Sequence, residues 1–562
     1  MTDAEPPKTN ASPPKKRRRS TAVKKKKTAA PVEPVVRATL APSHILIIDN
    51  GGDTLKYGWA TDEVPKLMPN MTARMPYQVT VLVGDELQKV QNPNSLIGVT
   101  RSTERGIITN LGNQTQVWKR LLDQLGVIVS VHSEAASSLG WKVAKTTVPK
   151  PPKTIPAPTI AVLLLLPPHC PRLVCDQILN VWLDDFGVSH VGLGVSSVCA
   201  AKPHPTYQTS CVVDLGWSQS VMVPTFKSKP ILDGKTTTTI KRVPIGGRHL
   251  TNMFKYYMSY RQYNMMDQEV LLRDVLEKLG YLSLQVDEDL ELARTLPSGR
   301  RRYDRDYVLP DYQTTFAGIV RVPLSLIRQQ ELEKKEQAEG EDDDGDDDDD
   351  EDDSDVKTDD EEDDEDDDDV EGEDENGKVA DDNKNKDSDG DDDEESLEQA
   401  RARIRKERAE AERRKRDEEE EEQVLRVSVE RFAVPEVLFR PFDAGLTSDL
   451  VGLSHAVVQS IQACPKPYQP ALYKSIYVTG GLSQLPNLKT RLEQEIRTLI
   501  PNEYELDIQM AESPINQAWL GAREWIKRSP YTQWSISREE WEAASKRKAY
   551  SRLLLLNGGA FV

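Results

Sequence analysis

Three short stretches of the chain place acidic residues, a lysine and glycines at a spacing that suits phosphate and metal chemistry. The first is Asp49-Asn50-Gly51-Gly52-Asp53, which follows the apolar run Ile45 to Ile48 and precedes Leu55-Lys56-Tyr57-Gly58-Trp59. A strand that ends in such a turn can bring backbone N–H groups and a carboxylate up to a phosphate, with Lys56 close enough to reach back. Taken alone, this stretch is more often an ordinary hairpin with a polar tip.

The same pattern occurs a second time, some 165 residues further along the chain. There the apolar strand Cys211 to Val213 runs into Asp214-Leu215-Gly216, and another apolar strand follows. A third apolar strand, Ser475 to Thr479, ends in the turn Gly480-Gly481. Each stretch is a weak signal by itself, but the combination of two Asp hairpins and a Gly-Gly turn is specific.

The elements that must position these loops are readable from hydrophobic spacing. The run from Ile160 to Pro167 predicts a buried strand. Helical spacing predicts helices over Thr115–Leu125, Ile178–Phe186, Val188–Ala201, Ser454–Gln462 and Asn487–Leu499.

This layout resembles the actin, heat-shock and hexokinase superfamily, whose α/β fold has two lobes around a central nucleotide cleft. Further segments resemble actin segments in the order of that family: Glu104–Asn110, Tyr307–Asp311, Glu430–Glu436 and Ala518–Gly521. Within the family, Leu250-Thr251-Asn252 followed by Ser259-Tyr260-Arg261-Gln262 resembles the actin-related proteins of Swr-type chromatin-remodelling complexes. The resemblance covers roughly residues 44–330 and 424–555.

The resemblance assigns roles to individual residues. Asp49 and Asp214 match the carboxylates that flank a divalent metal, and Lys56 matches the lysine that meets the phosphates. Glu277 matches the residue at the ribose. The resemblance therefore implies ATP or ADP with Mg²⁺ as the cofactor, with Asp49 and Asp214 as metal ligands and a nucleotide site made of Asp49, Asn50, Gly51, Lys56, Asp214, Gly216, Glu277, Gly480 and Gly481.

Other positions depart from the actin pattern in ways that weaken nucleotide binding. Asp53 replaces a glycine of the first loop, and a carboxylate near phosphate oxygens repels them. In the second loop Trp217-Ser218 replaces Asp-Gly, which puts a bulky ring in the turn. Leu276 and Ile515 replace basic residues near the base.

Hydrolysis is affected as well. By alignment, His190 takes the place of the glutamine that helps to orient the attacking water in actins, and Val221 takes the place of a nearby histidine. A water is activated only by correctly placed polar groups. We therefore predict no catalytic residue and no enzymatic activity.

The acidity of the chain belongs to one segment. Residues 341–397 contain 37 Asp or Glu and 4 Lys, so the remainder of the chain, with −20 overall, carries about +13. Such a run has almost nothing apolar to bury and is expected to be disordered, followed by a charged, solvent-exposed helix within Ser396–Gln423. A polyanion of this kind can hold histones, and the alternative of equal weight is a solvated spacer without a partner.

The N-terminal segment is basic and rich in proline. Lys15-Lys16-Arg17-Arg18-Arg19 and Lys24 to Lys27 favour a two-part nuclear import signal; a generic basic arm that touches DNA is the alternative. We expect the nucleus as the location, with the cytoplasm as a second compartment. No secretory signal and no membrane segment are expected, because Ile160 to Pro167, the longest apolar run, is far shorter than the ~20 residues of a membrane-spanning helix.

These features divide the chain into five parts. The predicted parts are a disordered basic tail (1–42), a first lobe (43–200), the first part of a second lobe (201–335), the acidic insertion with its charged helix (336–423), and the remainder of the second lobe with a return to the first (424–562). The five cysteines show no paired spacing and the seven histidines do not cluster, so neither disulfides nor a structural zinc site is expected.

Three functions are compatible with these features. The resemblance implies a non-catalytic subunit of a Swr-type remodelling complex that deposits a variant two-A histone, with the motor subunit, a small zinc-finger subunit, histones and nucleosomal DNA as partners. The segment between Pro76 and Arg105, together with the insertion, departs from the surfaces of polymerising actins, so no filament is expected. The alternatives are an active ATPase or kinase of the superfamily and a histone chaperone that acts alone through the insertion.

Overall fold

A computed structural model describes residues 43–129, 155–201, 208–232, 239–330, 334, 423–447 and 449–542. The predictions for the basic tail and for the insertion 336–422 concern residues outside these ranges and stay predictions. Within the ranges described, no helix has both the length and the apolar character needed to cross a membrane.

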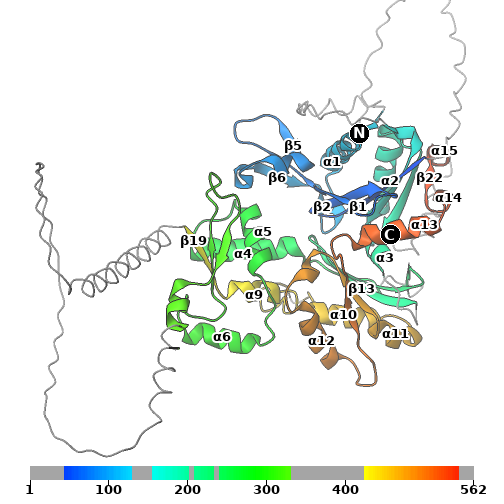
Figure 1. Cartoon of the computed structure of the whole chain (residues 1–562). Coiled ribbons are helices and arrows are strands. Elements are labelled where there is room, and N and C mark those ends of the chain that lie inside the picture. Colours follow the sequence, from blue (N-terminus) through cyan, green and yellow to red (C-terminus); the bar gives the residue numbers. More distant parts are fainter. Residues whose placement is uncertain are drawn as a thin grey trace, which may run out of the picture. The chain divides into compact units, whose positions relative to one another are not determined.

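Residues 44–195, together with one strand from residues 536–537, form a six-stranded sheet (Figure 1). Its strands lie in the order β22 (Ile536–Ser537), β12 (His190–Val195), β11 (Ile160–Leu166), β1 (His44–Asn50), β2 (Thr54–Trp59) and β3 (Lys66–Pro69). Strand β1 pairs antiparallel with β2 and parallel with β11, which confirms the predicted hairpin and the strand beside it.

Both faces of this sheet are covered, which explains the unbroken apolar run in β1. Leu46 and Ile48 pack on the side of α1 (Leu111–Gln124) and α2 (Arg172–Asn180), whereas Ile47 packs against Trp519 of α13 (Gln517–Arg528) on the other side. Successive residues of a strand point to opposite faces, so a strand covered on both sides must be apolar at every position.

A second six-stranded sheet is built from residues 209–243 and 476–510. Its strands lie in the order β15 (Lys229–Pro230), β14 (Ser220–Phe226), β13 (Thr209–Leu215), β20 (Ile476–Thr479) and β21 (Ile508–Met510), with β16 (Lys241–Val243) also paired to β14. Its core includes residues of α4 (Gly247–Arg261), α5 (Glu269–Leu279), α10 (Leu453–Gln462), α11 (Gln469–Tyr473) and α12 (Leu488–Leu499). The predicted helices 454–462 and 487–499 are confirmed to within one residue at their starts.

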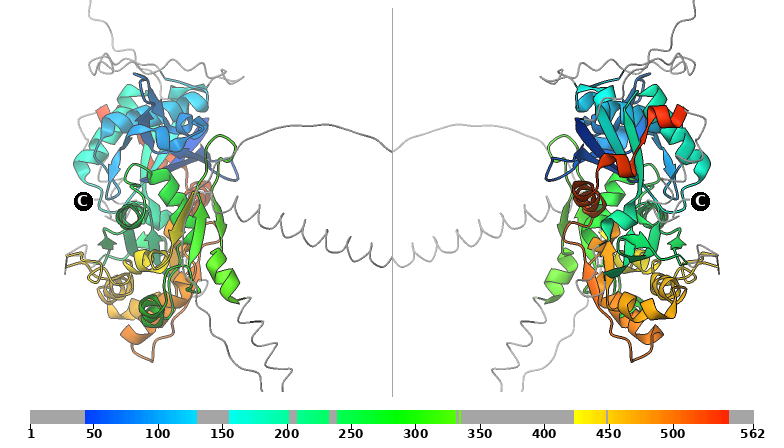
Figure 2. Two further views of the ribbon diagram at one scale, coloured as in Figure 1. Left: turned by 90° about the vertical axis from the view of Figure 1, so that its left-hand side faces the viewer. Right: turned by 90° about the vertical axis from the view of Figure 1, so that its right-hand side faces the viewer.

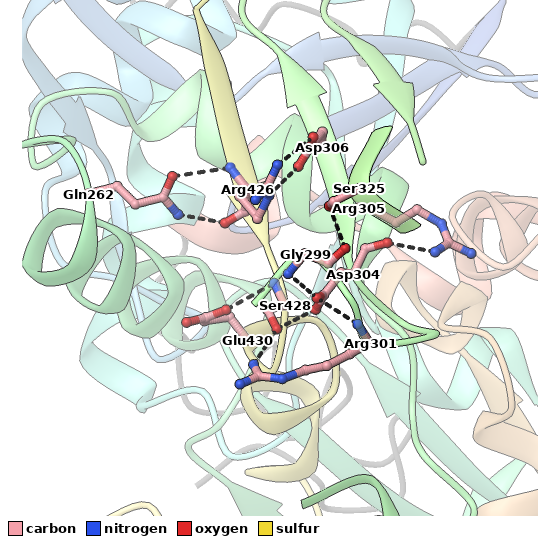
Figure 3. A network of polar contacts seen from close by, with 10 residues as sticks. All are labelled: Gln262, Gly299, Arg301, Asp304, Arg305, Asp306, Ser325, Arg426, Ser428 and Glu430. Atoms are coloured by element: carbon pink, nitrogen blue, oxygen red, sulfur yellow. Dashed lines mark hydrogen bonds and ion pairs between the residues drawn. The ribbon is translucent and has the colours of Figure 1, made fainter. Parts of the chain in front are cut away.

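A three-stranded sheet carries the chain across the insertion. Its strands are β18 (Ile319–Arg321), β17 (Arg305–Val308) and β19 (Val424–Val427), and β17 lies in the middle. Figure 3 shows the side chains that fix β19: Arg426 forms a two-pronged ion pair with Asp306 (2.7 and 3.0 Å), and Ser428 accepts a hydrogen bond from buried Arg301. Helix α6 (Val286–Thr295) precedes β17 in the chain and α9 (Glu430–Glu436) follows β19, and Figure 1 shows both below this sheet.

The remaining elements are short. Strands β4 (Met71–Arg74), β5 (Val81–Val83) and β6 (Ile97–Arg101) form a small sheet, β7 (Thr103–Glu104) pairs with β8 (Ile107–Ile108), and β9 (Val127–Ile128) pairs with β10 (Ile155–Pro156). Figure 2 shows the C-terminal helices, in red, beside the blue and cyan first sheet, to which α14 (Tyr531–Trp534), β22 and α15 (Arg538–Glu542) also return. Buried Trp519, Trp534 and Trp541 fix this return.

One predicted helix is wrong. Residues 188–201 form strand β12 followed by the short helix α3 (Ser196–Ala200), instead of one helix. The run is fully buried within the sheet, and a run of apolar residues buried on both sides has the same composition in a strand as in a core helix. The helix predicted over 178–186 begins earlier, at Arg172, and ends in a wider turn over Val181–Asp185.

Candidate functional site

The first loop is the turn of the β1–β2 hairpin. The pairing register sets Asp49 opposite Lys56, and Lys56 Nζ lies 3.4 Å from Asp49 Oδ2. A Cβ atom on Gly51 would stand 2.4 Å from the Thr54 carbonyl oxygen and 2.9 Å from Lys56 Nζ, so the turn requires glycine. The hairpin therefore presents a carboxylate and an ammonium group side by side at the end of a buried strand.

The second loop is the turn of the β13–β14 hairpin, and it presents Asp214. The Ser197 hydroxyl of α3 donates a hydrogen bond to Asp214 Oδ2 (3.0 Å). Burial, and then the charge of Asp49, raise the pKa of Asp214 to about 6, against the smaller lowering effects of Ser197 and Lys56. Two neighbouring carboxylates that share a single lysine are short of positive charge, which is the electrostatic setting that binds a divalent cation.

The third loop follows strand β20. Gly480 has φ +92°, and a Cβ atom there would stand 2.4 Å from the Leu215 carbonyl oxygen, so this position also requires glycine. A Cβ atom on Gly481 would meet nothing within 4 Å. The backbone at Gly481 is therefore open to an approaching ligand, while Gly480 packs the third loop against the second.

The three loops meet at one cavity of about 370 Å³. All nine residues predicted for the nucleotide site line it: Asp49, Asn50, Gly51, Lys56, Asp214, Gly216, Glu277, Gly480 and Gly481. The structure thus brings together residues from four distant parts of the chain. The volume is in the range of pockets that hold a cofactor.

Asn50 has a different role from the other predicted residues. Its amide oxygen accepts a hydrogen bond from Trp118 Nε1 (3.1 Å), and its amide nitrogen lies 3.4 Å from the Gln114 side-chain oxygen. Gln114 is fully buried and also accepts from Ser102 and Asn70. This network was not predicted from the sequence. It holds the first loop against α1 and the small sheet, and Asn50 positions the loop through it.

Part of the cavity lining is apolar. Leu276 and Ile515 line it, as does Leu482. Glu277 lies beside them and accepts a hydrogen bond from Arg273 (2.8 Å). Apolar side chains together with a carboxylate are a lining that suits a flat heterocycle with an attached sugar, and the role of Glu277 at the ribose stays a prediction.

The two departures in the loops are compensated by residues that sequence patterns did not identify. Asp53 forms ion pairs with Arg273 (2.7 Å) and Arg101 (3.3 Å), which lie far away in the chain. Burial would raise the pKa of Asp53, but the two arginines outweigh it and lower the pKa. Arg101 and Arg273 also lie over the ring of Trp217, with the guanidinium carbons 5.3 and 4.8 Å from its centre.

The position assigned to His190 is wrong. His190 is the first residue of β12, is buried against Tyr531 and is not among the residues that line the cavity. The cavity lies at the other end of this strand, where Ser196 and Ser197 line it. At about 3.3 Å per residue a six-residue strand carries its first residue some 20 Å away. Val221 does line the cavity, as predicted.

The site can hold a metal–nucleotide complex, and its side chains are already engaged. Asp49 and Asp214 would hold Mg²⁺, Lys56 and the turn amides would meet phosphates, and Gly481 offers open backbone. No histidine lines the cavity within the described part of the chain, and the amide oxygen of Gln219 is taken up by Arg242 (2.7 and 3.0 Å). The polar groups at hand are suited to binding more than to activating a water.

Comparison with known proteins agrees with this fold. The model of the actin family matches residues 41–550, and the chain belongs to the actin family. The predicted α/β actin-like fold is thereby confirmed.

Curated relatives narrow the comparison within the family. The chain is 28% identical over 519 residues to a rice (Oryza sativa) protein named actin-related protein 6, an alignment that covers 91% of this chain and 98% of the rice protein. Proteins of the same name from Arabidopsis thaliana (26%, 91% and 99% covered) and Drosophila melanogaster (22%, 89% and 96% covered) are also similar. The chain is thus similar over most of its length to proteins named actin-related protein 6.

Proposed function

We propose that this protein is a non-catalytic, actin-related subunit of a Swr-type chromatin-remodelling complex, in which another subunit supplies the ATP-driven motor. The observation that carries the proposal is similarity over nearly the whole length to proteins named actin-related protein 6, with 91% of this chain aligned. In this role the folded body is a scaffold, and the complex deposits a variant two-A histone in nucleosomes.

The composition of the cavity supports the absence of catalysis. Its polar side chains are engaged in internal contacts: Lys56 with Asp49, Asp53 with two arginines, and Glu277 with Arg273. Val221 replaces the histidine of the actin pattern with a side chain that cannot transfer a proton. Bound ATP or ADP with Mg²⁺ would then stabilise the fold as a resident cofactor.

The partners that we propose are the motor subunit, a small zinc-finger subunit, histones and nucleosomal DNA, and the proposed location is the nucleus. The two charged segments support this. The basic stretch Lys15 to Arg19 suits nuclear import, and the acidic stretch 341–397 has the charge to hold histones. Chains of opposite charge associate more quickly and in a salt-dependent manner.

The test is affinity purification of the tagged full-length protein from its own cells at moderate salt, followed by mass spectrometry and measurement of ATP hydrolysis. Recovery of a large ATPase, a zinc-finger protein and histones, without hydrolysis by the isolated chain, is the expected result. Recovery of the chain alone, hydrolysing ATP, would overturn the proposal in favour of an enzyme.

A matched variant separates the two parts of the proposal. In this variant a ten-residue Gly-Ser linker replaces residues 336–422. Gln423 is kept because its carbonyl oxygen accepts a hydrogen bond from the Leu309 N–H. We expect the motor and the zinc-finger subunit to be retained while histones are reduced. Unchanged histone recovery would assign the insertion to a spacer; loss of the motor would show that the insertion is part of the scaffold.

A further inference from the structure

The two residues that most disturb the phosphate loops form a single cluster at the cavity. Asp53, from the first hairpin, is bound to Arg101 of β6 and to Arg273 of α5. Arg101 also pairs with Glu269 of α5 (2.7 Å). The side chains of Asp53 and Arg101 are only 8% and 10% exposed, so the pair between them is shielded from solvent, whereas Arg273 and Glu269 are 31% and 28% exposed. We call Asp53, Arg101, Trp217, Arg273 and Glu269 the latch.

Trp217 is the apolar part of the latch. Its ring lies beneath both guanidinium groups and packs against Gly247, where a Cβ atom would come within 2.7 Å of the ring. The attraction between a guanidinium cation and the face of an indole ring is favourable, and it is stronger where water is excluded. The ring is therefore held in one position beside the turn of the second loop.

The turns of the two hairpins also touch. A Cβ atom on Gly52 would stand 1.9 Å from Ser218 Oγ and 3.2 Å from Thr103 Oγ1, and the Thr103 hydroxyl donates to the Gly52 carbonyl oxygen (3.3 Å). The tips of the first and second loops are thus closed against one another. The room between them is taken by protein atoms.

The charges of the side chains that line the cavity also disfavour an additional phosphate. Of the described side chains that line it, two are cationic and four are acidic: Lys56, Arg273, Asp49, Asp53, Asp214 and Glu277. Both cations are already paired with these carboxylates. Mg²⁺ would compensate Asp49 and Asp214, but each further phosphate would add negative charge beside the carboxylate of Asp53.

We propose that the latch occupies the place of a nucleotide's terminal phosphate, so that the cleft is a nucleoside-diphosphate site that rejects triphosphates. The inference rests on the proposed nucleotide-binding role of the cleft. A nucleotide whose sugar lies at Glu277 and whose phosphates reach Lys56 would place a third phosphate at the tips of the hairpins, where Asp53, Trp217 and Ser218 stand. Asp53 excludes it by charge, and the closed tips exclude it by volume.

The test is calorimetric titration of the full-length protein, freed of nucleotide and supplied with Mg²⁺, with ADP and with ATP. We expect ADP to bind at least tenfold more tightly than ATP. In Asp53→Gly the preference should fall to threefold or less, and Asp53→Asn, which keeps the volume and removes the charge, should lie between the two. Equal binding of both nucleotides, tighter binding of ATP or no binding of either to the wild type would overturn the proposal.

A control variant and a measurement of the bound nucleotide accompany the titration. Asp85→Asn breaks an equally short Asp–Arg pair, with Arg120 (2.6 Å), away from the cavity, and it should leave the ADP preference unchanged. Nucleotide released by acid from the freshly purified wild type should be ADP; recovery of ATP refutes the proposal even if Asp53→Gly does not fold. The ADP preference is measured on the purified protein and does not depend on which remodelling subunits are recovered with it. Failure of the ADP preference can therefore be distinguished from failure of the proposed function.

Discussion

Glu436, at the end of helix α9, makes the stability of the folded protein dependent on pH. Its carboxylate accepts from Arg491 of α12 (2.8 Å) and lies 3.5 Å from Arg440. Burial nevertheless raises the pKa of Glu436 from 4.5 to about 7, because the arginines compensate only part of the cost. The folded protein therefore holds this proton more tightly than the unfolded chain does.

The sign and size of the effect follow from this difference. Between pH 4.5 and 7 unfolding releases a proton, so the free energy of unfolding falls as the pH rises. At 1.36 kcal/mol for each pH unit, the loss approaches about 3 kcal/mol by pH 8. Glu436→Gln has no proton to release, so its stability relative to the wild type should improve by up to about this amount between pH 5 and pH 8.

Urea unfolding of wild type and Glu436→Gln at pH 5, 6, 7 and 8 measures this difference. Arg440→Gln is the companion variant: the Arg440 charge lowers the pKa of Glu436, so its removal should steepen the loss of stability above pH 6. A difference between Glu436→Gln and wild type that is the same at pH 5 and pH 8 would show that Glu436 does not titrate in this range.

Three further changes probe the loops and the insertion. Gly480→Ala should cost at least about 2 kcal/mol, because φ +92° and the Leu215 carbonyl both oppose a side chain, whereas Gly481→Ala, in open space, should be nearly neutral in thermal unfolding. Arg426→Ala leaves buried Asp306 unpaired and should cost about 3 kcal/mol by urea unfolding, while Arg305→Ala, which loses only bonds to backbone carbonyls, should cost less. Replacement of the 87 residues 336–422 by ten should leave the circular dichroism of the folded body unchanged. The shorter loop loses less entropy on closure and should stabilise the fold by about 1.9 kcal/mol; an unfolded product would refute this.

The loops were predictable because their signals are local. A strand ending in Asp and Gly, with Lys56 three residues beyond the turn, fixes both the hairpin and its register, and the structure places Asp49 opposite Lys56. Helix α12 was predictable for a similar reason, since its apolar residues recur at helical spacing on one buried side. Strand β12 was not, because burial on both faces removes the alternation that distinguishes a strand.

What the sequence could not provide is the partner of a charge. Asp53 and Trp217 each stand out as unfavourable changes when considered alone. Their compensation comes from Arg101 and Arg273, which are 48 and 220 residues from Asp53 and belong to other elements. No pattern within a window of sequence connects these residues; only the packing of α5 and β6 beside the first hairpin does.

The residues of the cleft do not carry equal weight as signs of a ligand. Gly51 and Gly480 are required by backbone geometry, so their presence is explained by folding alone. Asp49 and Asp214 are different, because folding places two carboxylates together at a cost that raises the pKa of Asp214 to about 6. A side chain that destabilises the fold is accounted for by what it binds, which is the physical argument for the proposed site of Mg²⁺ with a nucleotide.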